Sequence, residues 1–526
     1  MAQAKTVAAP SPSADEGDAK GSPWLTLLAV SLGVIMVMLD GTVVGIANPV
    51  IGRELQASLS DLQWVTSGYL LALAVFLITA GKLGDLFGHK RIFLIGVAGF
   101  TVTSLAIGFT GSITALIFFR VLQGLFGALL QPAALALLRN AFPGPKLNQA
   151  MGAWGAIIGL SSAAGPIVGG LLVENVSWQS VFFINGPVGV AALIMGVVII
   201  KESKSRLLSR VDWLGVVLLS GAMFSLIWSI IKAPEWGWGD AKTIGFLIGF
   251  AVLTAVFIFW QTAARTPLVP LSIFKNPSVS IGTGLMMMVA FAMFGAMFFL
   301  GFFFQGVHGL TPLEAGLRML PMSAGMIIAS PLAGMAIGKL GPKITMASGL
   351  LITALAMFLM SRLGVEATFV ESGIPFLVLA FGLSPVFVGA TEIIVGNVDP
   401  QYAGVAGGVQ QSAMQVGGAL GTAILGAVMA GEIADKLPGH LGPAAQAIKP
   451  EQMHLLEKAA AFGTAPTQGL PAEVAQLVTT AVHNSFMDGM HLAFLVSTGV
   501  AILTAVLALF VKRGSAPTEG APVHVG

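Results

Sequence analysis

The sequence contains no cysteine and few charged residues. Cysteine is absent from all 526 residues, which excludes disulfides and thiolate metal sites. Charged residues make up 10% of the chain, against about 25% in a typical soluble protein, whereas hydrophobic residues make up 56%. The mean hydropathy is +0.89. This composition excludes an ordinary water-soluble domain and predicts a protein embedded in a lipid bilayer.

Motifs for nucleotide or metal chemistry are also missing from the sequence. His residues such as His89, His308 and His483 are scattered and do not follow metal-ligand spacing. The sequence has no phosphate-binding loop and no ATPase motif. We therefore expect no enzyme activity, no cofactor, no metal and no nucleic-acid partner. Any transport must then draw its energy from an ion gradient.

Apolar stretches of about 20 residues recur from Trp24 to Phe510. A helix of that length crosses a hydrocarbon core about 30 Å thick, because each residue adds about 1.5 Å. The stretches are continuously apolar rather than alternating, which favours helices over a β-barrel. We predict an all-α polytopic membrane protein with fourteen transmembrane helices, at residues 24–48, 62–81, 91–110, 113–139, 149–173, 180–200, 213–231, 243–261, 279–305, 313–337, 343–362, 375–397, 402–430 and 487–511.

Positive residues indicate how the chain crosses the membrane. With the N-terminus inside, the inside segments hold about twice as many Lys and Arg residues as the outer loops. We therefore predict a multi-pass protein of the bacterial cytoplasmic membrane with both termini in the cytoplasm. Residues 1–22 are rich in Ala, Ser and Pro and are expected to form a disordered tail.

A short repeat divides the chain into two halves. Gly81–Gly84 reads Gly-Lys-Leu-Gly and recurs as Gly338–Gly341, each copy after the second helix of a six-helix half. Two six-helix halves leave a pair of helices over, which we predict to be inserted between them. The outer loop is expected either to cap the outer mouth or to lie on the membrane surface. The predicted parts are the tail 1–22, the N-terminal bundle 23–210, the inserted pair 211–265, the C-terminal bundle 266–513 with its outer loop 431–486, and the tail 514–526.

Ionisable residues inside predicted helices are functional candidates, because burying a charge in a membrane is costly. Asp40 and Arg120 lie about 24 Å and 28 Å from the cytoplasmic ends of their helices, at nearly matched depth. An Asp beside an Arg stays charged, whereas separating or drying the pair favours protonation. We predict that this pair carries a coupled proton; the alternative is a static pair that locks two helices.

Glu392 lies about a turn and a half before the cytoplasmic end of its predicted helix. It is expected to face a cavity near the cytoplasm and to attract a cationic substrate; the alternative is a solvated charge at a helix end. Other candidates are amides or adaptable apolar side chains on helices expected to line the same cavity. The predicted substrate-binding residues are Glu392, Gln123, Gln131, Gln411, Gln415, Met293 and Phe294.

Two glycine-rich segments are candidates for gating. The cytoplasmic link 81–91 contains glycines that permit a sharp turn, and its Asp85 is expected to lie at a helix N-terminus or to pair with a cation. The second segment lies in the fifth predicted helix, where side chains are small enough for a close helix crossing. The predicted gating residues are Gly81, Asp85, Gly88, Lys90, Arg91, Gly165, Pro166, Gly169 and Gly170.

These segments resemble motifs of the major facilitator superfamily, and specifically of its fourteen-spanner drug:proton antiporters. The link 81–91 is similar to the superfamily's cytoplasmic signature, with Leu86 where Arg is usual. The other similar segments are the span-one motif Leu39–Pro49, the span-four motif Phe119–Gly124, whose Arg is implicated in proton coupling, the exporter-type span-five motif Gly152–Gly170, and the subfamily element Trp178–Pro187.

The resemblance implies two bundles that rock about a central cavity. A proton is expected to move inward as an amphipathic, cationic drug or antibiotic moves out. Two alternatives stay open, namely a proton-coupled symporter of a nutrient or metabolite and a membrane receptor or scaffold that does not transport. The expected partners are the drug, protons and the lipid bilayer, and the protein is expected to be a monomer.

Overall fold

The computed structural model describes residues 23–142, 146–202, 211–398, 403–442, 445 and 448–511, and the predicted tails 1–22 and 514–526 lie outside this set. The described residues form helices and no strands. The helices are α1 (Pro23–Glu54), α2 (Leu59–Phe87), α3 (His89–Phe109), α4 (Ile113–Ala141), α5 (Lys146–Asn175), α6 (Ser180–Phe183), α7 (Asn185–Ile199), α8 (Trp213–Trp236), α9 (Ala241–Ala263), η1 (Leu271–Lys275), α10 (Pro277–Phe302), η2 (Phe303–Val307), α11 (Pro312–Arg318), α12 (Leu320–Leu340), α13 (Pro342–Met360), α14 (Phe369–Gly396), α15 (Ala403–Leu441), α16 (Pro450–Ala460) and α17 (Ala472–Ala508).

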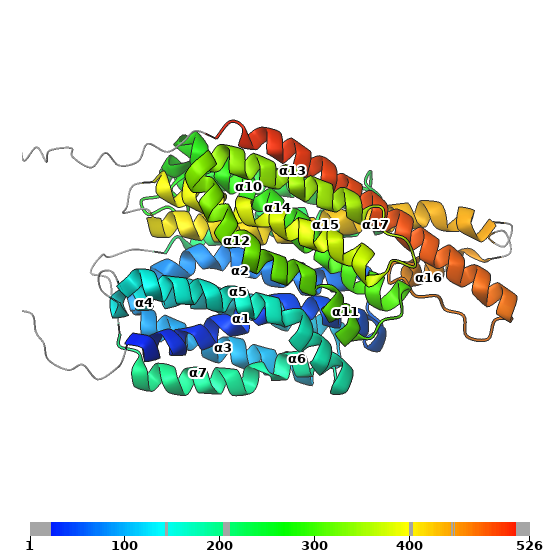
Figure 1. The fold of residues 1–526 in the computed structure, drawn as a ribbon, viewed down its shortest axis with the longest axis horizontal. Helices are drawn as coiled ribbons and strands as arrows, with labels where there is room; N and C mark the ends of the chain where they lie inside the picture. Colours follow the sequence, from blue (N-terminus) through cyan, green and yellow to red (C-terminus); the bar gives the residue numbers. More distant parts are fainter. Residues whose placement is uncertain are drawn as a thin grey trace, which may run out of the picture.

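The predicted all-α membrane fold is confirmed. Among the described residues, 13 helical segments are long and apolar enough to cross a membrane. The remaining predicted span, 149–173, lies within α5, which has 30 residues. Figure 1 shows α1–α7 together on one side of the molecule and α10–α17 together on the other. The start of α1 and the end of α17 lie at the same end of the molecule, which is the predicted cytoplasmic end (Figure 1).

Three predicted segments differ in detail from the observed helices. The predicted helix 180–200 is broken at Ile184 into α6 and α7, and 313–337 is broken at Met319 into α11 and α12. Pro321 explains the second break, because proline has no backbone N–H and fits only the first turn of a helix. The predicted loop 431–486 is largely helical, because α15 runs on to Leu441, α17 begins at Ala472 and α16 lies between them in sequence, and this region projects beyond the other helices (Figure 1).

The two halves meet along α2 and α15. Ser412 Oγ donates a hydrogen bond to the Ala74 carbonyl at 2.7 Å, and Gln63 Nε2 donates to the Thr422 carbonyl at 3.1 Å. The inserted helices α8 and α9 pack against each other, and α8 also contacts α2 and α15. The inserted pair therefore lies beside the seam between the halves.

Close backbone contacts join the halves at the end that carries α11 and α16, which is the predicted outer end and is called the outer end below. A Cβ atom on Gly316 would lie 2.3 Å from the Pro166 carbonyl oxygen, so only glycine fits there. Gln305 Nε2 also donates to the Ile46 carbonyl at 2.8 Å. The halves are therefore closed against each other on this side.

The segment after α16 covers the closed outer end. The rings of Phe462 and Phe302 meet edge to face at 5.5 Å, and a Cβ atom on Gly52 of α1 would lie 2.8 Å from the Phe462 ring. On η2, a Cβ atom on Gly306 would lie 2.0 Å from the Phe462 carbonyl oxygen. One short turn thus contacts both halves, as expected for a cap over the outer mouth.

Candidate functional site

The centre of the N-terminal half contains a buried ion pair. Asp40 on α1 is 2% exposed and Arg120 on α4 is 1% exposed. Arg120 Nη1 donates a charge-assisted hydrogen bond to Asp40 Oδ2. The matched depth predicted from the sequence therefore corresponds to direct contact between the two side chains.

Neighbouring groups complete the hydrogen bonding of the pair. Gln123 Nε2 donates to Asp40 Oδ1 at 3.0 Å, and Gln123 Oε1 accepts from Arg120 Nη1 at 2.7 Å. Arg120 Nε donates to the Val65 carbonyl at 3.2 Å. The guanidinium carbon also lies 4.0 Å from the centre of the Tyr69 ring, in a cation–π contact. Because two charges are removed from water together, breaking the pair would leave a costly buried charge.

A second layer of polar side chains surrounds the pair. Ser104 on α3 accepts hydrogen bonds from Gln123 Nε2 at 3.2 Å and from Asn185 Nδ2 at 2.9 Å. Its own hydroxyl donates to the Phe182 carbonyl at 3.0 Å. With Val65 and Tyr69 on α2, the network therefore extends over α1, α2, α3, α4, α6 and α7. It gives Asp40 a fixed set of partners that protonation of its carboxylate would disturb.

Sequence reasoning missed part of this network. Ser104 and Tyr69 are buried, yet they carry no charge and lie on other helices than the pair. Asn185 belongs to the resemblance element Trp178–Pro187, which was the only available signal. Gln123 was predicted to bind substrate, but the structure places it inside the ion-pair network with no exposed surface. Helical spacing correctly placed Gln123 on the same face of its helix as Arg120. Spacing alone could not show whether that face lines a cavity or a buried hydrogen-bond network.

Glu392 and its neighbours lie toward the predicted cytoplasmic end of the C-terminal half. Glu392, on α14, is exposed, and the preceding Thr391 accepts a hydrogen bond from Gln410 Nε2 at 2.6 Å. Gln411 Nε2 on α15 donates to Gln131 Oε1 on α4 at 3.1 Å. The last contact joins the two halves, so two predicted substrate residues from different bundles do meet.

The other predicted substrate residues lie between α10 and α15. Phe294 on α10 is partly buried, and a Cβ atom on Gly418 would lie 2.8 Å from its ring. Met293 is also partly buried. Gln415, one turn after Gln411, is 4% exposed, and its side-chain oxygen has no hydrogen-bond partner.

The link between α2 and α3, which is predicted to be cytoplasmic, makes a sharp glycine turn. Gly88 has φ of +100°, a conformation that favours glycine. Asp85 Oδ1 lies 3.3 Å from His89 Nε2 within the link, and so the predicted pairing with a cation requires protonated His89. At the N-terminus of α3, Glu202 Oε1 accepts a hydrogen bond from the Lys90 backbone N–H at 3.0 Å, and Arg91 Nε lies 3.9 Å from Glu202 Oε2.

Glu202 was not predicted, although a carboxylate at a helix N-terminus is favoured by the helix dipole. It occupies the position expected of Asp85. A Cβ atom on Gly81, a predicted gating residue, would meet no other atom within 4 Å, so packing does not require glycine at this position.

The glycines of α5 permit two different close approaches. A Cβ atom on Gly165 would lie 1.8 Å from Thr42 Oγ1, and one on Gly169 would lie 3.2 Å from Val43 Cγ1. These contacts join α5 to α1 within the N-terminal half. A Cβ atom on Gly170 would instead lie 2.6 Å from the Leu313 Cα, so this glycine permits contact with α11 of the other half.

A carboxylate that sequence reasoning missed fastens the inserted pair. Asp212 caps α8 and accepts hydrogen bonds from Trp260 Nε1 at 2.7 Å, Gln261 Nε2 at 2.8 Å and two backbone N–H groups, of Gly215 at 2.9 Å and Leu268 at 3.3 Å. Burial alone would raise the pKa of Asp212, but these hydrogen bonds together lower it.

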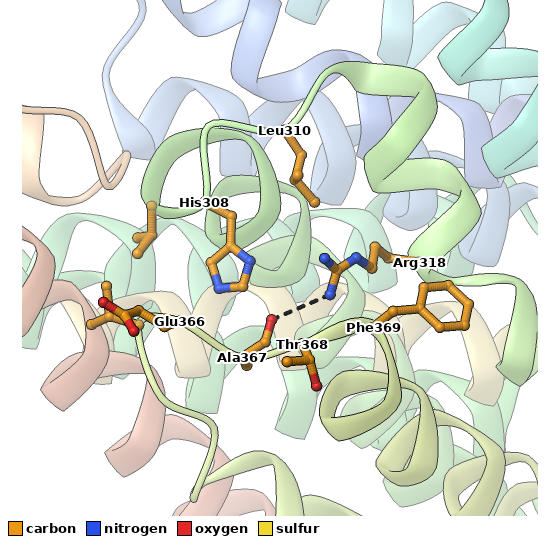
Figure 2. A pocket seen from close by; sticks show the side chains of 9 residues that line it. His308, Leu310, Arg318, Glu366, Ala367, Thr368 and Phe369 are labelled. Carbon is orange, nitrogen blue, oxygen red and sulfur yellow. Dashed lines mark hydrogen bonds between the residues drawn. The ribbon is translucent and has the colours of Figure 1, made fainter.

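A pocket of about 560 Å³ lies where η2, α11 and the connection between α13 and α14 meet (Figure 2). Arg318 lines it and donates from Nη1 to the Ala367 carbonyl at 3.2 Å, which fixes the connection between α13 and α14. Burial and the nearby Arg318 lower the pKa of His308, another lining residue. None of the residues that line the pocket was predicted to bind substrate. The pocket lies where several segments of the C-terminal half pack together, which favours a structural role. Within the described residues no group of three or more His, Asp or Glu side chains is arranged to hold a metal ion.

Comparison with known proteins matches this architecture to one family. Residues 30–422 fit the family model described as Major Facilitator Superfamily. The tetracenomycin C resistance and export protein of Streptomyces glaucescens is 50% identical over 506 residues, covering 96% of this chain and 94% of that protein. The multidrug resistance protein Stp of Mycobacterium tuberculosis is 33% identical over 491 residues, covering 90% of this chain and 89% of that protein.

A solved structure shows the same fold at low sequence identity. A bacterial homologue of the human lysosomal transporter Spinster, in an inward-facing and unoccupied conformation, has a TM-score of 0.64 and 16% identity, covering 95% of this chain and 100% of that chain. The matching relatives and structures are transporters rather than enzymes. The chain therefore belongs to the major facilitator superfamily and, within it, to the drug-efflux transporters.

Proposed function

We propose that this protein exports amphipathic, cationic drugs or antibiotics in exchange for protons, as a monomer in a bacterial cytoplasmic membrane with both termini in the cytoplasm. The observation that carries this proposal is the buried pair of Asp40 and Arg120. A carboxylate whose only charged partner is an Arg can exchange that partner for a proton when the helices move. The energy of a proton gradient then becomes available to the conformational cycle.

The arrangement of the halves supports alternating access. Backbone contacts such as Gly316 with Pro166 close the outer end, so in this state a drug enters from the cytoplasm. Exposed Glu392 provides negative charge near that entrance and attracts a cation before it is desolvated. Proton binding at Asp40 weakens the network with Arg120 and Gln123, which lie in the half that must rock.

The names of the relatives support drugs as the substrate class. One relative is described as exporting tetracenomycin C and conferring resistance to it, and another as conferring multidrug resistance. The exporter-type motif that the sequence resembles lies on α5, where its glycines permit close contact with α1 and α11. These features favour export over the nutrient symporter, and the buried ion pair favours a transporter over a receptor or scaffold.

Purified protein in liposomes provides the direct test. Ethidium should accumulate inside vesicles with an acidic lumen while the membrane potential is held at zero, because outward proton movement drives inward drug movement. Collapsing the pH gradient should abolish the accumulation. Ethidium that moves in the same direction as the proton would identify a symporter, and ethidium movement that ignores the gradient would overturn proton coupling.

A growth experiment identifies the substrates. In a host that lacks its own efflux pumps, the protein should raise the inhibitory concentrations of amphipathic cationic antibiotics and dyes. Unchanged inhibition by every compound in such a panel, with the protein present in the membrane, would contradict drug export.

A further inference from the structure

Gln415 is an unusual buried side chain. It lies on α15, is 4% exposed, and its oxygen is buried without a hydrogen-bond partner. The other buried glutamines of the described residues, Gln63, Gln123, Gln261 and Gln305, each make at least one side-chain hydrogen bond, although the Gln305 oxygen also has no partner. A buried amide without a partner is unfavourable, and so an unpaired amide in a native protein requires an explanation.

The position of Gln415 points to a ligand rather than to a packing defect. One turn before it, Gln411 donates to Gln131 of the opposite half at 3.1 Å. One turn after it, Gly418 lies against the Phe294 ring on α10 and the Leu70 side chain on α2. Residues three and four apart share one face of a helix. Gln415 therefore lies on the face of α15 that meets both halves.

This face combines two kinds of contact. The paired amides of Gln411 and Gln131 lie on one side of Gln415, and the aromatic ring of Phe294 lies on the other. An aromatic ring of a ligand gains favourable contact with Phe294, and an N–H or O–H group on that ligand satisfies the free oxygen of Gln415. An apolar ligand without such a donor leaves the amide unpaired.

We propose that Gln415 selects flat aromatic drugs that carry an N–H or O–H hydrogen-bond donor. The proposal rests on the proposed function for the location of the substrate, and it adds a chemical requirement that charge alone does not supply. A site built around a buried polar group discriminates against a ligand that lacks the matching group, because that polar group then stays unpaired. Glu392 attracts the cation, and Gln415 distinguishes among cations.

Two acridinium dyes of equal charge provide the test. The N-methylated diaminoacridinium cation of acriflavine has free amino groups, and in its tetramethylated analogue every amine N–H is replaced by N–CH₃. Binding to the purified protein is measured by dye fluorescence, so the test does not depend on proton coupling. Wild-type protein should bind the diamino dye more tightly than the methylated analogue.

The Gln415→Met variant removes the amide and keeps a similar length and volume. It should weaken binding of the diamino dye about threefold to tenfold, the value of one hydrogen bond, and change binding of the methylated dye by less than about twofold. The methylated dye reports that the variant is folded. Gln476→Met, on the exposed outer part of α17, is the matched control and should bind both dyes as the wild type does.

Several outcomes would overturn the proposal. These are equal losses for the two dyes, no loss for either, a wild type that binds neither dye, and a wild type that prefers the methylated analogue. Dyes that bind as predicted but are not exported would contradict the proposed function and leave the role of Gln415 in recognition supported.

Discussion

The two links that carry the repeated Gly-Lys-Leu-Gly both turn at a glycine, but at different positions relative to the repeat and in different electrostatic surroundings. The first link turns at Gly88, four residues after its copy of the repeat, with φ of +100°, and the second turns at Gly341, the last residue of its copy, with φ of +81°. In the N-terminal link, Glu202 accepts a hydrogen bond at the start of α3. In the C-terminal link, the next residue is Pro342, which needs no partner for a backbone N–H at the start of α13.

The same difference extends into the bundles. The N-terminal half holds the buried ion pair of Asp40 and Arg120, whereas the C-terminal half contributes Gln415, Phe294 and the exposed Glu392. The repeat thus accompanies a glycine turn in both halves, whereas among the described residues the buried Asp–Arg pair lies in the N-terminal copy. We infer that the N-terminal half handles the proton and that the C-terminal half supplies most of the drug contacts.

The largest expected effect comes from detaching the inserted pair from the halves that it adjoins. Asp212→Ala removes a buried acceptor and leaves donors such as Trp260 Nε1 and Gln261 Nε2 unpaired. At about 1–3 kcal/mol for each buried unpaired donor, we expect a loss of at least about 3 kcal/mol and a clear fall in melting temperature in detergent. Asp240→Ala, which removes the cap of α9, is the matched control and should cost about 1 kcal/mol. Equal melting temperatures for the two variants would show that the hydrogen bonds of Asp212 do not stabilise the packing of the inserted pair.

The pH dependence of this effect follows from the lowered pKa of Asp212. A carboxylate whose pKa falls on folding stabilises the protein above its ordinary value of 3.8, and that contribution is lost as the pH falls through the folded-state pKa. The difference in melting temperature between wild type and Asp212→Ala should therefore stay constant from about pH 7 to about pH 5. A difference that shrinks across this range would mean that Asp212 is protonated near neutral pH.

A second variant tests whether the halves touch at the outer end in only part of the cycle. Gly170→Ala places a Cβ atom 2.6 Å from the Leu313 Cα, so it should destabilise the outward-closed state by about 1–3 kcal/mol. Because the chain has no native cysteine, two introduced cysteines can carry spin labels on α5 and α11. Their distance distribution should shift to longer values. Gly431→Ala has open space around it and should leave the distribution unchanged, and an unchanged distribution in both variants would contradict the gating role of Gly170.

The smallest expected effect comes from Glu392 in the C-terminal half, which we propose contacts the drug. Glu392→Gln should weaken export of monovalent cationic drugs by about 1 kcal/mol or more, about fivefold to tenfold, because it removes charge-assisted attraction. Neutral substrates should be spared. Transport rates are compared with those of Glu366→Gln, which changes an exposed carboxylate at the pocket lined by Arg318. Loss of proton coupling for every substrate would show that Glu392 shares the proton with Asp40, and no change would leave Glu392 a solvated charge.

The sequence predicted those features that depend on local pattern. Apolar length predicted the helices, and depth along two helices predicted the contact between Asp40 and Arg120. Glu202 was missed because it contacts a helix distant in the sequence. Asp212 caps the adjacent α8, but its contacts with Trp260 and Gln261 are distant in the sequence, and local spacing does not reveal them. Gln123 was assigned to the drug cavity because a helical face shows only direction and not what lies opposite.

Paired measurement of drug and proton fluxes in proteoliposomes containing the Asp40→Asn variant tests the central claim most directly. Asparagine keeps the shape of the side chain and cannot take up a proton. The account predicts that drug addition releases or consumes no protons in this variant, while the melting temperature shows a folded protein and Asp61→Asn, at the outer end of α2, retains coupling. Drug-dependent proton movement at the wild-type ratio in Asp40→Asn would contradict the assignment of the coupled proton to Asp40.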